Sequence, residues 1–95
     1  MSKILLIPKD LAKEIKALFS GNTNIITMLE NADARLPQEI RDRCEARLKF
    51  SAEQLIKWEK DSFIKKPFEL AREVIRCRQI ADELQKTVFV AQIAQ

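Results

Sequence analysis

The chain lacks histidine and tyrosine, and its 95 residues include only one glycine, two cysteines and three prolines. Without histidine, a cysteine nucleophile has no general base of the usual kind, and two cysteines are too few to fill a four-coordinate zinc site within one chain. A single glycine also excludes a glycine-rich phosphate-binding loop. We therefore expect no catalytic residue, no metal site and no cofactor, and a protein that is not an enzyme.

The scarcity of glycine and proline also limits the fold, because tight β-hairpin turns depend on special backbone conformations that glycine supplies. Alanine, leucine, isoleucine, glutamate, lysine and arginine dominate the composition, and most of these residues favour helices. A chain of 95 residues has the size of one domain with one modest core. The composition predicts an all-α fold in a single domain that spans residues 1–95.

The prolines divide the chain, and each suits the first turn of a helix, where its missing N–H costs no hydrogen bond. After an extended segment over residues 1–7, Pro8 predicts a short helix over residues 8–20, with Gly21 as the residue after its C-cap. A polar residue at 22–24 is expected to cap a second short helix, which runs to about residue 34.

Pro37 and Pro67 begin two longer predicted helices, over about residues 37–64 and 67–93. Apolar residues recur on each at spacings of three and four, which gives one continuous stripe per helix. We predict that these helices pack as an antiparallel hairpin with its turn near 64–67, and that the two short helices pack on it as a small helical bundle. The first stripe is Ile40, Cys44, Leu48, Ala52, Leu55, Ile56 and Phe63, and the second is Pro67, Leu70, Val74, Cys77, Ala81, Leu84, Val88 and Ala91.

The same hairpin predicts that the two cysteines are far apart. With a turn at 65–66, Cys77 lies level with Gln54, and Cys44 is displaced from it by about 15 Å along the helix axis at 1.5 Å per residue. That separation exceeds the reach of a disulfide. Both cysteines are expected to be buried, reduced thiols.

The charge and hydropathy patterns bear on location and partners. The formal net charge is +3, with acids and bases interspersed, whereas dedicated nucleic-acid-binding domains usually show a larger or more segregated excess. The apolar run at residues 4–7 is too short for a signal peptide, and no stretch is long enough to span a bilayer. We expect a cytoplasmic protein that makes no membrane contact.

The function most consistent with these patterns is the binding of another protein through helix faces, as a regulator, adaptor or inhibitor. Aromatic side chains would anchor the partner, and nearby bases would steer its approach. The compact, mildly basic composition also fits small regulators that phages or mobile elements encode. The candidate partner-binding residues are Phe50, Trp58 and Phe63 as anchors, Arg43, Arg47, Lys57 and Lys60 as steering charges, and Val88, Phe89 and Ile93 at the apolar C-terminal end.

Two alternatives remain open. Aromatic residues among the bases of residues 37–64 are also typical of a regulatory protein that binds nucleic acid. The apolar segments at 4–7 and 88–93 must be covered by each other, by a partner or by a second copy, so a structural homodimer is the other alternative.

Overall fold

The computed structural model describes the backbone of residues 5–60 and 67–94, and the side chains of residues 5–57 and 67–87. Within these ranges every regular element is a helix, as the composition predicts. The elements are α1 (Lys9–Leu18), α2 (Thr23–Glu30), α3 (Leu36–Lys60) and α4 (Pro67–Ala94).

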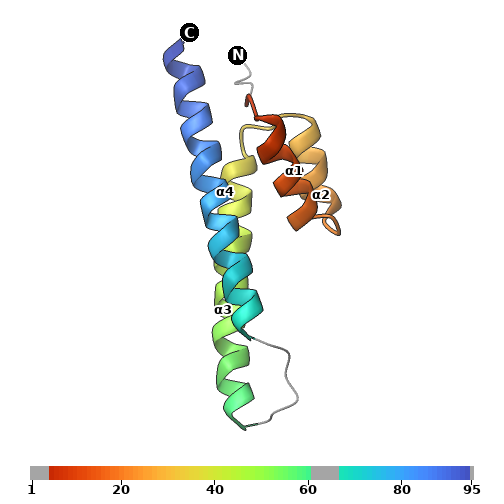
Figure 1. The fold of residues 1–95 in the computed structure, drawn as a ribbon, viewed down its shortest axis with the longest axis vertical. Coiled ribbons are helices and arrows are strands. Elements are labelled where there is room, and N and C mark those ends of the chain that lie inside the picture. The colour runs from red at the N-terminus through yellow and green to blue at the C-terminus, as the bar shows by residue number, and fades with distance from the viewer. Residues whose placement is uncertain (1–4, 61–66, 95) are drawn as a thin grey trace.

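The two long helices, α3 and α4, pack against each other as an antiparallel hairpin, and α1 and α2 lie against one side of its upper half (Figure 1). The molecule is elongated, with extents of 54 × 22 × 22 Å, because the hairpin extends well beyond the part that α1 and α2 cover. We call the uncovered part, residues 48–57 of α3 and 67–75 of α4, the bare half. The predicted small bundle of two short helices on a helical hairpin is confirmed.

The short helices begin at the expected signals. Pro8 immediately precedes α1, and the Asn22 side-chain oxygen accepts a hydrogen bond from the Ile25 N–H at 3.2 Å, which makes Asn22 the N-cap of α2. The prediction for Gly21 is wrong, however. Phe19 is the C-cap of α1, and Gly21 does not have a positive φ.

The left-handed position that usually takes glycine is occupied by Ala32, at φ 49°. The Asp33 N–H donates to the Met28 carbonyl at 2.9 Å, and the Ala32 N–H donates to the Leu29 carbonyl at 3.2 Å. This pair of bonds is the Schellman arrangement that closes a helix. It ends α2 at Glu30, so the helix is shorter than the predicted span to residue 34.

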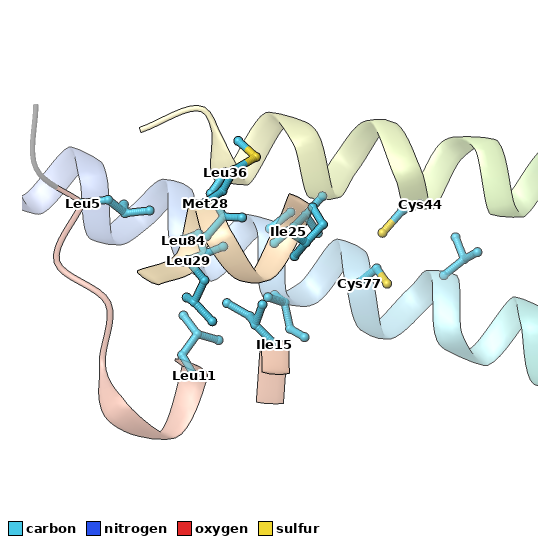
Figure 2. Packing of buried hydrophobic residues seen from close by; sticks show 14 residues of the cluster. Leu5, Leu11, Ile15, Ile25, Met28, Leu29, Leu36, Cys44, Cys77 and Leu84 are labelled. Atoms are coloured by element: carbon cyan, nitrogen blue, oxygen red, sulfur yellow. The ribbon is translucent and has the colours of Figure 1, made fainter. Parts of the chain in front are cut away.

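The hydrophobic core lies where α1 and α2 cover the hairpin (Figure 2). Every helix contributes to it, and Leu5 closes it from the segment before α1. Ile80, beside the predicted stripe of α4, is also buried, and α4 contacts both α3 and α1. The buried apolar residues are Leu5, Leu11, Ile15, Ile25, Met28, Leu29, Leu36, Ile40, Cys44, Val74, Cys77, Ile80, Ala81 and Leu84.

The predicted stripe of α3 is correct only as far as Cys44. Leu48, Leu55 and Ile56 are exposed, and the buried residue that α3 contributes to the bare half is Ser51, whose hydroxyl donates to the Pro67 carbonyl oxygen at 3.1 Å. Two helices alone bury only a narrow line of side chains between them, because no third element covers the flanks. Residues on either side of that line therefore remain in contact with water.

The predicted separation of Cys44 and Cys77 is wrong. The two residues lie opposite each other on α3 and α4 (Figure 2), and their thiols are hydrogen-bonded. The prediction placed the middle of the hairpin at the residues just before Pro67. The pairs Cys44–Cys77 and Arg41–Asp82 instead place it near residue 61, which brings the two cysteines to one level.

Candidate protein-binding surfaces

A cavity of about 540 Å³ opens between the α1–α2 turn and the middle of the hairpin. We call it the Phe50 cavity. Leu18 and Phe19 line one wall, and Arg43, Arg47 and Phe50 line the other. The spacing of four and then three residues places these three side chains on one face of α3. Three of the partner-binding residues predicted from the sequence therefore meet at one site.

Each arginine of the cavity has a carboxylate nearby. An Arg43 Nη nitrogen lies 3.2 Å from a Glu39 carboxylate oxygen one turn earlier on α3, and the Arg47 Nε lies 3.9 Å from a Glu73 carboxylate oxygen on α4. The second separation is too long for a hydrogen bond. In addition, the Arg43 Nε is buried without a hydrogen-bond partner among the described residues. The exposed guanidinium of Arg47 is therefore open to an incoming acceptor, whereas the Arg43 Nε is shielded from one.

Phe50 supplies the apolar part of the site. Its side chain is 46% exposed, although an aromatic ring of this size gains free energy when it is covered. Lys57 follows two turns later on the same face of α3 and is also exposed. The arrangement is an exposed ring flanked by two guanidinium groups, which suits an apolar side chain that is accompanied by a carboxylate.

The remaining sequence-predicted site residues lie outside the described side chains. Trp58 and Lys60 belong to the last turn of α3, and Val88, Phe89 and Ile93 belong to the end of α4, where only the backbone is described. Phe63 and the predicted turn at 64–66 lie outside the described residues. The structure thus brings together Arg43, Arg47 and Phe50, with Lys57 farther along the same face.

A second exposed surface includes Leu48 and Leu55, which were predicted to belong to the apolar stripe of residues 37–64. Leu48 and Leu55 of α3 and Phe68 and Ile75 of α4 are all exposed on the bare half of the hairpin. A comparison of helix lengths would have revealed this exposed surface. Helices of 10 and 8 residues are about 15 and 12 Å long, whereas the 25 residues of α3 extend about 37 Å, so the short helices leave part of the hairpin uncovered.

The cysteine pair is part of the packing and is shielded from solvent. Burial raises the pKa of Cys44, and it raises the pKa of Cys77 further because the Cys77 thiol also gives its proton to the hydrogen bond with Cys44. A reactive cysteine needs the opposite shift, since the thiolate is the nucleophile. Both thiols therefore stay protonated at neutral pH.

Within the described residues, no helix combines the length and the apolar character needed to cross a bilayer. Comparisons of the chain with protein-family models, with curated proteins and with solved structures found no match.

Proposed function

We propose that the protein is a non-catalytic regulator, adaptor or inhibitor that binds another protein at the Phe50 cavity. The observation that supports this proposal is the convergence of Phe50, Arg43 and Arg47 on one cavity beside the α1–α2 turn. The ring offers an anchor, and the two guanidinium groups select a partner segment that carries both an apolar side chain and a carboxylate.

The electrostatics of the cavity favour a protein partner over a nucleic acid. A nucleic-acid surface needs bases that are free to neutralise phosphates. Here Glu39 lies beside Arg43 and Glu73 beside Arg47, so each base is already accompanied by an acid that repels a phosphate. A partner with one carboxylate and a large apolar side chain fits this mixed surface better than a polyanion does.

We also propose that the protein acts in the cytoplasm. Buried cysteines kept as thiols, such as Cys44 and Cys77, are typical of proteins in a reducing compartment. The size and composition remain consistent with a regulator that a phage or mobile element encodes.

Site-specific photo-crosslinking in the source cell tests the proposal. A benzophenone side chain at position 50 is expected to yield a covalent adduct with one protein, and the adduct is expected to survive nuclease treatment. The same group at Lys13, which is exposed on α1, serves as the control and should not yield that adduct. Loss of the adduct after nuclease treatment, or an equal yield from position 13, would rule out a protein partner at the Phe50 cavity.

A further inference from the structure

Aromatic rings line the Phe50 cavity on two of its walls. Phe19, the C-cap of α1, belongs to one wall, and Phe50 of α3 belongs to the other. Cys77 of α4 also lines the cavity although only 2% of it is exposed, so it forms the floor. Aromatic rings attract one another in offset or edge-to-face arrangements. A planar ring that enters the cavity therefore meets an aromatic side chain on either side.

The size and the lining of the cavity are those of a small-molecule site. Its volume of about 540 Å³ falls in the range of about 300–1,000 Å³ that is typical of such sites. Small-molecule sites combine mostly apolar walls with a few polar groups that orient the ligand. Here the apolar walls are supplied by Leu18, Phe19, Ala46, Phe50 and Cys77, and the orienting groups are the two arginines.

Arg47 is the group best placed to orient an anionic ligand. Its side chain is 53% exposed, and the 3.9 Å between its Nε and the Glu73 carboxylate oxygen is too long for a hydrogen bond. A separated ion pair that water reaches contributes little free energy. A guanidinium group can instead donate two parallel hydrogen bonds to one carboxylate, which is a stronger contact. A ligand carboxylate therefore gains free energy by replacing Glu73 at Arg47.

The spacing of Arg47 and Phe50 sets the distance between the ligand's carboxylate and its ring. Residues three apart on a helix are neighbours on its surface, with Cβ atoms about 5–6 Å apart. A carboxylate on Arg47 and a ring against Phe50 are therefore joined by a linker of about two carbon atoms. An arylalkanoic acid with a short side chain has this shape.

The acidic residues limit the ligand to one negative charge. Glu73 lines the cavity, and a Glu39 carboxylate oxygen lies 3.2 Å from an Arg43 Nη nitrogen. Each of these carboxylates repels a further anionic group, so a dicarboxylate or a phosphate ester is disfavoured. Because Glu73 also competes with the ligand for Arg47, removal of its charge should strengthen binding.

From these observations we infer that the Phe50 cavity binds a small arylalkanoic acid, with its carboxylate on the Arg47 guanidinium and its ring between Phe19 and Phe50. The acid fills the volume that an anchoring side chain of the partner protein would take, so the acid and the partner exclude each other. The binding of the acid depends on the cavity alone, whereas its regulatory effect rests on the proposed function.

Titration of the isotope-labelled full chain with hydrocinnamate, followed by the NMR shifts of backbone amides, tests the binding. The dissociation constant is expected to be on the order of 1 mM for a ligand of this size, with shifts centred on residues 18–22 and 43–50. Hydrocinnamyl alcohol lacks the carboxylate and propionate lacks the ring, and each should bind at least about fivefold more weakly. Equal affinities for the acid and the alcohol, or shifts centred elsewhere, would overturn the inference.

Two variants test the placement of the carboxylate. Arg47→Gln should weaken the binding of hydrocinnamate at least about fivefold and leave that of hydrocinnamyl alcohol unchanged. Glu73→Gln should strengthen the binding of hydrocinnamate about threefold, because it removes the competing acid. Glu83→Gln is the matched control, since Glu83 is exposed on α4 about 15 Å farther along the helix axis, and it should leave the affinity unchanged. A Glu73→Gln variant that binds the acid no better than Glu83→Gln does would show that the carboxylate does not lie at Arg47.

The partner captured by crosslinking at position 50 tests the mutual exclusion. Hydrocinnamate at about ten times its dissociation constant should raise the apparent dissociation constant of that partner for wild type about tenfold. An unchanged affinity for the partner would refute the exclusion. A captured partner without acid binding would refute the inference and leave the proposed function standing, whereas acid binding without a captured partner would support the acid site and refute the proposed function alone.

Discussion

The Ser51 hydroxyl donates a hydrogen bond to the Pro67 carbonyl oxygen and thereby joins the bare half of α3 to the start of α4. Ser51 is the only buried polar residue among the described residues, and it lies between two helices that have no third layer beside them. A neutral hydrogen bond of this kind contributes about 1 kcal/mol to stability, so its effect on so slender a hairpin is measurable.

Ser51→Ala is expected to lower the free energy of unfolding by about 1 kcal/mol, because it removes the donor and leaves a buried site unfilled. Urea unfolding followed by circular dichroism measures the change. The control is Ala52→Ser, which adds a hydroxyl at the neighbouring exposed position and should change the stability by less than about 0.5 kcal/mol. Equal effects of the two substitutions would contradict the role assigned to Ser51.

Local signals made much of the fold predictable. Pro8 and Pro67 mark helix starts through the chemistry of their own residues, and Asn22 caps α2 with its own side chain. The buried line of α4 was predictable because helical periodicity depends only on neighbours in the sequence. In each of these cases, no long-range contact is needed to decide the outcome.

Features that depend on long-range contacts could not be predicted from the sequence. The axial position of Cys44 relative to Cys77 depends on the register between α3 and α4. A proline at the start of one helix does not determine that register. The exposure of Leu48 depends on how far α1 and α2 extend along the hairpin. Arg43, Arg47 and Phe50 were predictable as one face of α3, but the opposite wall of their cavity is supplied by the α1–α2 turn.

The second prediction concerns Ala32, which has a left-handed backbone conformation, and Gly21, which does not. A left-handed conformation costs an alanine about 1 kcal/mol relative to glycine, so Ala32→Gly should raise the free energy of unfolding by about 0.5–1 kcal/mol. Gly21→Ala should be neutral or stabilising by about 0.5 kcal/mol, because a Cβ there meets nothing within 4 Å and the residue lacks a positive φ. Urea unfolding of both variants checks the pair, and a destabilising Ala32→Gly would refute the assignment.

The buried thiols give a dependence of stability on pH. The pKa of Cys44 and of Cys77 is raised by folding from an ordinary value near 9.0, so the native state holds these protons more tightly than the unfolded chain. The associated stability is present in full below pH 9 and is lost as the pH rises above it. Unfolding measured from pH 8 to pH 10.5 should show this decline.

The control for the pH series is the double variant Cys44→Ala, Cys77→Ala. Its stability at pH 8 should be lower, because two buried sulfurs are removed from the core. Its further decline between pH 9 and pH 10.5 should be smaller than that of wild type. An identical slope in both proteins would show that other groups titrate with folding.

The last prediction concerns the Phe50 cavity and requires the partner captured by crosslinking at position 50. Phe50→Ser should weaken binding by about 2 kcal/mol, or about 30-fold, because it removes the central apolar anchor. Ile56→Ser is the matched control, since Ile56 is also an exposed apolar residue of α3 but does not line the cavity. Arg47→Gln should reduce the association rate mainly at low salt, where the charge steers the partner. Titration calorimetry and stopped-flow kinetics measure these effects, and equal losses from Phe50→Ser and Ile56→Ser would show that the partner does not bind at the cavity.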